Sequence, residues 1–338
     1  MCLGKIYRRI ASFVNKPPPK APIGSARGQD TNKNATRLQR LADLRNEPID
    51  TVRNRFGPLL DTLPSFSKYT SMLPALPIAA SGVEEGRAWI RLKNGRIFYG
   101  YLSRSNHRQA FKFFKDQVPD GINEDTFLLG LDVCHRYISG KPCPWETGLP
   151  LPDKPKYIVE CGAYLGHKTI RFAERVAEAN GQMLAIEMMP DNVEILKKNI
   201  EANGLQSVVK VIQAGVWSEP GSMPIRGAGR QRNSLLEIKN ITEFRNVDVR
   251  VDSLDNLIGE WDVEANAIDL VYITVNGAEL EALRGLDAAA PRVNALFVVA
   301  HYHAEGGRSS AEVCREILGN RGYTLYSSPH GAHVLAAR

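Results

Sequence analysis

The sequence of 338 residues predicts an α/β protein: a doubly wound, mostly parallel sheet over residues 151–338, preceded by an N-terminal α+β extension and a flexible basic arm. Two observations predict this fold class. After Pro155, short apolar runs of strand length alternate with segments of helix length, which is typical of a parallel sheet covered by helices on both faces. The first of those runs also passes through a glycine-containing turn straight into a helix, as βαβ units do.

The elements expected in residues 151–338 follow from hydrophobic patterning and from stop signals. Helices are expected at 167–180 and 190–203, where Gly181 and Gly204 mark the ends. Five apolar runs are predicted as strands, at 157–159, 183–186, 208–212, 268–273 and 295–299. Ligands of such sheets bind outside the carboxyl ends of the strands, so polar side chains and glycines at those ends are candidates for the binding site.

The first 150 residues divide into an arm, 1–35, and an extension, 36–150. The arm holds three consecutive prolines and a polar run, and this composition cannot bury enough apolar surface to fold alone. Within the extension, Lys93-Asn94-Gly95 joins two apolar runs, and Asn-Gly favours a type I′ hairpin turn. We expect a helix at 36–46, an irregular segment at 57–85 because it contains four prolines, a hairpin at 88–103 and a helix at 125–139.

Charge and cysteine content narrow the function classes. The net charge is +6, yet residues 1–60 hold 12 Lys/Arg and 4 Asp/Glu, which leaves 31 and 33 for the rest of the chain. A body without basic excess argues against a nucleic-acid partner for the folded domain. Five cysteines with no Cys-x-x-Cys pair argue against a disulfide framework and a metal site, and favour a cytoplasmic protein. No apolar run approaches the ~18–20 residues that span a bilayer.

The glycine turn after residues 157–159 is the first candidate site. It reads Glu160-Cys161-Gly162-Ala163-Tyr164-Leu165-Gly166-His167 and leads into the helix at 167–180. Glycine allows a ligand close to the backbone, and the helix N-terminus offers free N–H groups to an anion, either a pyrophosphate or the carboxylate of a methionine group. A dinucleotide site would need G-x-G-x-x-G, but Tyr164 and His167 occupy its second and third glycine positions. The acid-x-Gly-x-x-x-Gly spacing favours S-adenosylmethionine over a nicotinamide cofactor, and an ordinary strand–helix turn is the alternative.

Glu187 is the second signal, because it ends the strand at 183–186 one βαβ unit after the glycine turn. An acid at this place accepts hydrogen bonds from ribose hydroxyls in nucleotide-binding sheets of this kind. A lone glutamate at a strand end is otherwise a solvated side chain. We therefore predict a cofactor site made of Glu160, Gly162, Tyr164, Gly166 and Glu187.

Several segments between residues 157 and 302 resemble the FkbM family of methyltransferases. They are Val159-Glu160-Cys161-Gly162-Ala163, Ala185-Ile186-Glu187, the helix 192–205, Val251-Asp252-Ser253-Leu254-Asp255-Asn256-Leu257, and Ile268-Asp269-Leu270-Val271-Tyr272-Ile273-Thr274-Val275-Asn276-Gly277-Ala278-Glu279-Leu280. The last is similar to the family signature I-D-L-I-K-I-D-V-E-G-A-E-L. The resemblance implies a Rossmann-like class I methyltransferase fold, S-adenosylmethionine as cofactor, and O-methylation of a sugar or other small metabolite.

The chain departs from that signature beside the expected methyl donor. Thr274 stands where the family has Asp, and Asn276 where it has Glu. Threonine and asparagine can position a hydroxyl but are poor bases at neutral pH. His301 and His303 follow the strand at 295–299 on the same edge of the sheet, and histidine has a suitable pKa for a general base. We name Thr274, Asn276, His301 and His303 as catalytic candidates, with loop histidines as the alternative.

Methyl transfer to a small-molecule acceptor is the function this pattern favours. Arg230 and Arg232, in the loop 227–234, are candidates for closing over an acidic substrate. Three alternatives stay open: an S-adenosylmethionine-binding module that has lost catalysis, a nicotinamide-dependent oxidoreductase, and a surface-tethered protein that acts through its basic arm. The sequence also leaves open whether the protein is a homo-oligomer.

Overall fold

The computed structural model describes residues 48–51, 76–139, 143–227, 245–261, 263, 266–301, 307–328 and 330–338. The predictions of a flexible arm at 1–35 and of a helix at 36–46 lie outside these residues, as do Arg230, Arg232 and His303. The chain forms two compact units, one of residues 1–74 and 104–118, the other of residues 75–103 and 119–338. In the described part of the first unit, helix α5 (Ser105–Phe114) continues into a short 3-10 helix, η3 (Lys115–Gln117).

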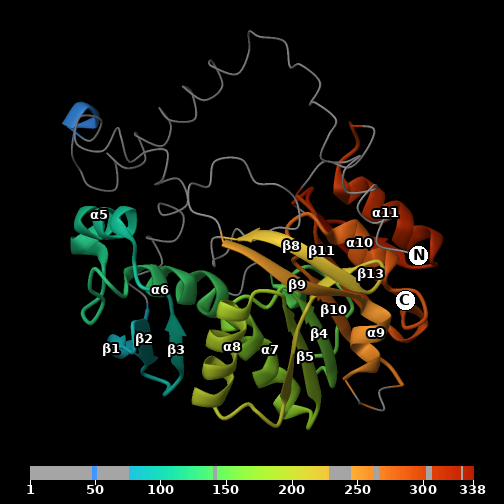
Figure 1. The fold of residues 1–338 in the computed structure, drawn as a ribbon, viewed down its shortest axis with the longest axis horizontal. Coiled ribbons are helices and arrows are strands. Elements are labelled where there is room, and N and C mark those ends of the chain that lie inside the picture. The colour runs from blue at the N-terminus through green and yellow to red at the C-terminus, as the bar shows by residue number, and fades with distance from the viewer. Residues whose placement is uncertain are drawn as a thin grey trace. The chain divides into compact units, whose positions relative to one another are not determined.

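The second unit is built on a seven-stranded sheet with the order β12-β13-β11-β10-β4-β5-β6 (Figure 1). All neighbouring pairs from β11 to β6 are parallel, whereas β13 runs antiparallel to both β11 and β12. The predicted doubly wound, mostly parallel sheet is therefore confirmed. The strands are β4 (Tyr157–Cys161), β5 (Gln182–Glu187), β6 (Val209–Gln213), β10 (Leu270–Ile273), β11 (Ala295–Val299), β12 (Thr324–Tyr326) and β13 (His333–Ala337).

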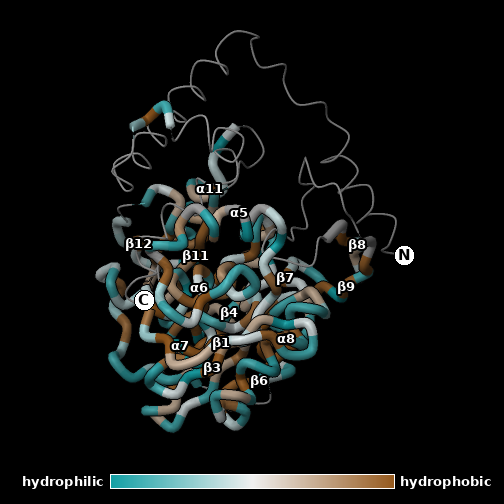
Figure 2. The backbone as a smooth tube through the Cα atoms, turned by 90° about the vertical axis from the view of Figure 1, so that its left-hand side faces the viewer, coloured by the Kyte–Doolittle hydropathy of each residue, from teal (hydrophilic) through white to brown (hydrophobic). Residues whose placement is uncertain are grey.

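Helices cover both faces of this sheet. Helix α7 (His167–Glu178) contacts β4 and β5, and α8 (Pro190–Ala202) contacts β6 on the same face. The opposite face packs on α9 (Leu254–Gly259), α10 (Glu279–Arg284) and α11 (Ser310–Asn320) through one apolar cluster. Alternate residues of β10 point to opposite faces, so Val271 and Ile273 join that cluster while Tyr272 faces α7. The hydropathy colouring of Figure 2 shows the apolar character of the central strands.

A second sheet, which hydrophobic patterning did not identify, lies between β6 and β10 in the sequence. It consists of β7 (Gly215–Trp217), β8 (Gly221–Gly227) and β9 (Arg245–Ser253), in the order β7-β9-β8. Residues 228–234 of the loop predicted at 227–234 follow β8 and lie outside the described residues.

The segment from 78 to 100 forms an N-terminal sheet of three antiparallel strands, β1 (Ile78–Glu84), β2 (Arg87–Leu92) and β3 (Ile97–Gly100). The expectation of irregular structure up to residue 85 was wrong, because β1 pairs along β2 and forms a strand despite the prolines before it. The prediction of a type I′ turn at Asn94-Gly95 was also wrong. Gly95 N–H donates to the Leu92 carbonyl, and only Gly95 of the loop has a positive φ, as in a type I turn followed by a left-handed glycine.

The helix predicted at 125–139 is confirmed in position but not in regularity. Helix α6 (Phe127–Asp132) continues directly into a π-helical segment, η4 (Val133–Ile138). Single turns of π-helix are rare in proteins and occur frequently at functional sites. This segment contacts α7, which starts at the glycine turn.

Asn199 of α8 and Asn203, the C-cap residue of that helix, satisfy the free edge of β3. The Asn199 side chain accepts a hydrogen bond from Tyr99 N at 2.6 Å and donates to Tyr99 O at 3.0 Å. Asn203, one helical turn later, bonds in the same way to the backbone N–H and carbonyl of Ile97, at 3.1 and 2.6 Å. Because both amides mimic a neighbouring strand, they fix the N-terminal sheet against the helix that follows β5.

Candidate functional site

The glycine turn after β4 requires its two glycines. Gly162 has φ +85°, and a Cβ atom there would lie 2.3 Å from the Thr274 carbonyl oxygen. Gly166 has φ +81°, and its Cβ would lie 2.4 Å from Cδ1 of Leu196. The turn therefore packs directly on the end of β10 on one side and on α8 on the other. Tyr164, between the glycines, has φ +56°, a conformation that costs a bulky residue of order 1–3 kcal/mol.

Glu187 lies at the carboxyl end of β5 and is tied to the glycine turn. Its Oε2 accepts a hydrogen bond from Tyr164 N at 2.9 Å. Its Oε1 accepts from Met189 N at 3.0 Å and from the Asn192 side chain at 3.1 Å. Burial raises the pKa of this carboxyl, while the hydrogen bonds oppose that shift. The chain thus holds the carboxylate in a fixed orientation beside the turn.

Tyr101, which follows the N-terminal sheet, is linked to the Glu187 carboxylate through the side chain of Asn192. The Tyr101 hydroxyl, just after β3, donates to Oδ1 of Asn192 at 2.8 Å, and Asn192 donates to Glu187. Neither Tyr101 nor Asn192 was predicted as a site residue. Only the packing of the segment after β3 against α8 brings them together.

Glu160 and Lys168 form a buried polar cluster on the face of the sheet that α7 covers. Glu160 accepts a hydrogen bond from the Thr169 hydroxyl at 2.6 Å, and burial raises the pKa of Glu160 to about 7. Lys168 Nζ donates to the Tyr272 hydroxyl at 2.8 Å, and burial lowers the pKa of Lys168 to about 7. Tyr272 stands at the lysine of the family signature, and the Lys168 side chain reaches its hydroxyl from a different element, α7.

His167, the first residue of α7, is fully buried and joins the glycine turn to the N-terminal sheet. Its Nε2 lies 3.2 Å from the Tyr99 carbonyl, and its ring meets Phe98 edge to face at 5.5 Å. Its Nδ1 has no hydrogen-bond partner among the described residues. Burial lowers the pKa of His167 to about 3, so the ring is neutral at pH 7.

Acid should therefore destabilise the protein through His167. Between pH 6.5, where an exposed histidine titrates, and about pH 3, the unfolded chain binds a proton that the folded chain does not. The contribution of this residue to the free energy of unfolding is complete above pH 6.5 and falls as the pH decreases. Relative to wild type, H167Q should gain stability between pH 7 and pH 4 in urea unfolding, because it removes the group that the unfolded chain protonates. A difference between wild type and H167Q that does not change with pH would contradict this.

The two positions that lack the family acids follow the carboxyl end of β10, and Thr274 also contacts the glycine turn. Thr274 N–H donates to the Cys161 carbonyl at 2.9 Å, and the Thr274 hydroxyl lies 3.2 Å from the same oxygen. This hydroxyl thus bonds to the backbone that enters the glycine turn. Asn276 has φ +42°, and Glu279 accepts a hydrogen bond from the next residue, Gly277, at 2.9 Å. Asn276 therefore occupies a tight turn at the carboxyl end of β10.

His301 follows β11 and is exposed, and two further histidines accompany it. Its ring centroid lies 6.2 Å from that of His333, the first residue of β13, and His330 lies 5.0 Å from His333. Burial lowers the pKa of His333 to about 4, and the charges of the other two histidines add to this. Sequence reasoning missed His330 and His333, because they come from the hairpin that reverses the chain at the edge of the sheet.

No group of three metal-ligating side chains is found among the described residues, and the four described cysteines are free and buried. Nor does any helix in the described ranges combine the length and apolar character needed to cross a membrane.

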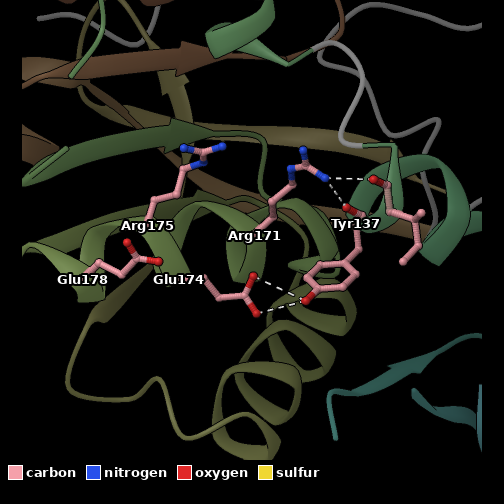
Figure 3. Close-up of a pocket in the computed structure, with 6 residues that line it drawn as sticks. Tyr137, Arg171, Glu174, Arg175 and Glu178 are labelled. Atoms are coloured by element: carbon pink, nitrogen blue, oxygen red, sulfur yellow. Dashed lines mark hydrogen bonds between the residues drawn. The ribbon is translucent and has the colours of Figure 1, made fainter. Parts of the chain in front are cut away.

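A pocket of about 400 Å³ opens on the outer face of α7, beside the end of the π-helical segment (Figure 3). Arg171 donates to the carbonyls of Tyr137 and Ile138 at 2.7 and 2.9 Å, and the Tyr137 hydroxyl donates to Glu174 at 3.0 Å. The remaining charged residues of the lining also have partners, since Arg175 stacks on Trp145 and Glu178 pairs with Lys154. The lining residues therefore hold the π-helical segment against α7, and their charged groups are already paired rather than available to a ligand.

Comparison with known proteins identifies methyltransferases as relatives of this chain. Residues 160–325 match the model of the methyltransferase FkbM domain. Methyltransferase sdnD of Sordaria araneosa is 28% identical over 196 residues, which cover 50% of this chain and 74% of that protein. Catechol O-methyltransferase of Sus scrofa is 36% identical over 60 residues, or 18% of this chain and 32% of that protein.

Two solved structures are similar at low identity. The crystal structure of methyltransferase FkbM from Methylobacillus flagellatus KT has a TM-score of 0.39 and 15% identity, covering 69% of this chain and 66% of that one. Aeropyrum pernix fibrillarin, crystallised with natively bound S-adenosyl-L-methionine, has a TM-score of 0.37 and 10% identity, covering 77% and 98%.

The doubly wound sheet, the glycine turn and the acid at the end of β5 define an α/β protein of the class I methyltransferase fold. More particularly, residues 160–325 belong to the FkbM methyltransferase domain family. The resemblance inferred from the sequence is thereby confirmed.

Proposed function

We propose that this domain binds S-adenosylmethionine at the glycine turn and transfers its methyl group to an oxygen of a small-molecule acceptor. The observation that carries the proposal is the hydrogen bond from Tyr164 N to Glu187 Oε2, because it joins the two predicted halves of a nucleoside site. The residues present fit such a cofactor. A fixed carboxylate lies at the carboxyl end of β5 for a ribose, and the N-cap of α7 is a glycine with no side chain over the first-turn N–H groups.

Bound S-adenosylmethionine would supply an already activated methyl group, so the chain has to align the acceptor and exclude water. Thr274, Asn276 and His301 are the proposed groups on the acceptor side. Thr274 and Asn276 follow β10, His301 follows β11, and these strands are parallel neighbours. An imidazole is the best remaining base where the family acids are absent. His333, which is neutral at pH 7, lies within the same histidine cluster.

A non-catalytic cofactor-binding module is the second candidate function. It is favoured by the hydroxyl of Thr274, which bonds to the Cys161 backbone rather than lying free for an acceptor. The two functions share the cofactor site and differ only in turnover.

Calorimetry and thermal unfolding with S-adenosylmethionine, S-adenosylhomocysteine and NAD test the cofactor assignment. We expect the first two to raise the melting temperature, since a ligand at 100 times its Kd stabilises the folded state by about 2.7 kcal/mol. NAD should have no effect. Absence of binding at millimolar S-adenosylhomocysteine would refute the proposal.

Release of S-adenosylhomocysteine in the presence of hydroxyl-bearing acceptors then separates the two candidates. Turnover that depends on the acceptor supports the enzyme. Binding without turnover across sugars, phenols and hydroxy acids supports the module.

A further inference from the structure

Arg136 lies outside the family domain yet reaches its glycine turn. It belongs to the π-helical segment Val133–Ile138, before the first residue of the match at 160. Its guanidinium carbon lies 4.8 Å from the centroid of the Tyr164 ring. Tyr164 is the residue that the turn holds at a positive φ. The π-helical segment thus places a cation directly on the side chain at the centre of the turn.

The hydrogen-bonding capacity of this guanidinium is not used up by the described residues. Its Nε is buried and has no hydrogen-bond partner there. The carboxylate of Asp132, one turn earlier, lies 3.9 Å from Nε, which is ion-pair range but beyond a hydrogen bond. The Arg136 side chain as a whole keeps 26% of its surface exposed. A buried donor without an acceptor is costly, so this geometry indicates a ligand acceptor.

The charges around Arg136 also indicate an anion. Arg136 favours the charged form of Glu160, but it disfavours the ammonium of Lys168 and a protonated His167. Lys168 already donates to Tyr272. A second anion beside Arg136 would relieve this repulsion. Guanidinium groups bind carboxylates with two parallel hydrogen bonds, a geometry that a planar fork provides and an ammonium does not.

We propose that Arg136 binds the α-carboxylate of the cofactor's methionine moiety; this rests on the proposed function, since it assigns part of the same S-adenosylmethionine site. The carboxylate would lie between the guanidinium and the first turn of α7, beside Tyr164. The cofactor site then extends into the segment before residue 160. The π-helical segment positions this arginine, and Arg171 holds the end of that segment by its two backbone hydrogen bonds.

The test compares two ligands that differ by one group: S-adenosylhomocysteine and its decarboxylated analogue, which keeps the amine. Wild-type protein should bind S-adenosylhomocysteine more tightly, by ~10–100-fold, as expected for a charge-assisted contact. R136M should lose ~10–100-fold in affinity for S-adenosylhomocysteine and bind the analogue within about twofold of wild type. R136K, which keeps the charge but not the fork, should lie between the two. R175M is the matched control and should change neither affinity. Arg175 lies on α7 in the pocket of Figure 3 and stacks on Trp145.

Each other result is decisive. If R136M weakens both ligands equally, Arg136 has only a structural role and the proposal is wrong. If R136M changes neither affinity, the guanidinium does not contact the cofactor and remains available to an anionic acceptor, which also overturns the proposal. If wild-type protein binds neither ligand, the cofactor assignment itself fails and the arginine proposal with it. Should R136M fail to fold, R136K gives the same decision. The difference in affinity between the two ligands must then be smaller in R136K than in wild type.

Discussion

Replacing Gly162 with alanine is expected to destabilise the protein by about 2–5 kcal/mol. The left-handed conformation costs an L-residue roughly 1–2 kcal/mol, and forcing an extra carbon into a packed site costs roughly 1–3 kcal/mol more. The steric cost arises because the new Cβ would lie 2.3 Å from the Thr274 carbonyl oxygen, a backbone atom that cannot rotate away. Either the glycine turn or the end of β10 must move, so cofactor binding should fall as well.

Gly204 is a matched control because it shares the backbone conformation without the contact. It has φ +68°, and no heavy atom would lie within 4 Å of its Cβ. G204A should therefore cost only the conformational part, roughly 1–2 kcal/mol. Urea unfolding of both variants measures the difference. Equal losses would mean that the close approach of β10 to the turn does not constrain residue 162.

Replacing Glu187 should have the largest effect on cofactor affinity among single carboxylates of the domain. E187A removes a buried acceptor and leaves the Tyr164 and Met189 N–H groups and the Asn192 amide without their partner. A hydrogen bond to a charged group contributes about 1.5–3 kcal/mol, so we expect ~10–100-fold weaker binding of S-adenosylhomocysteine. E187Q, which keeps the shape and one acceptor oxygen, should lose less.

Glu194 provides the comparison for Glu187. It lies on α8, its side chain is 69% exposed, and it forms an ion pair with Arg87 on β2. An exposed pair of this kind contributes about 0–1 kcal/mol. E194A should leave affinity for S-adenosylhomocysteine within about twofold. Calorimetric titrations of the three variants would contradict the ribose assignment if E187A and E194A bound the ligand equally well.

Local sequence signals sufficed for the framework of the domain. The runs 157–159, 183–186 and 295–299 lie within β4, β5 and β11, because a buried parallel strand must be apolar along its whole length. The positions of Gly162 and Glu187 could be predicted in the same way, because the residues next to them in the sequence mark the end of a strand or a turn. The N-terminal sheet was only partly predicted. Two apolar runs around Asn94-Gly95 identified β2 and β3, whereas β1 consists mainly of small residues and becomes a strand by pairing with β2.

The tertiary structure alone decided which side chains meet. Asn199 pairs with Tyr99, Tyr101 reaches Asn192, and Arg136 stacks on Tyr164, although each pair is separated by 28 to 100 residues in the chain. No local pattern encodes these contacts. The sequence around an asparagine on an amphipathic helix is the same whether its side-chain amide hydrogen-bonds to water or to the edge of a strand. The sequence by itself determined the fold class, the glycine turn and the acid at the end of β5, through periodicity and backbone sterics. The packing of the segment before residue 160 against α7 and α8 determined the surroundings of that turn, because burial and unpaired hydrogen-bonding groups exist only once distant elements are in contact.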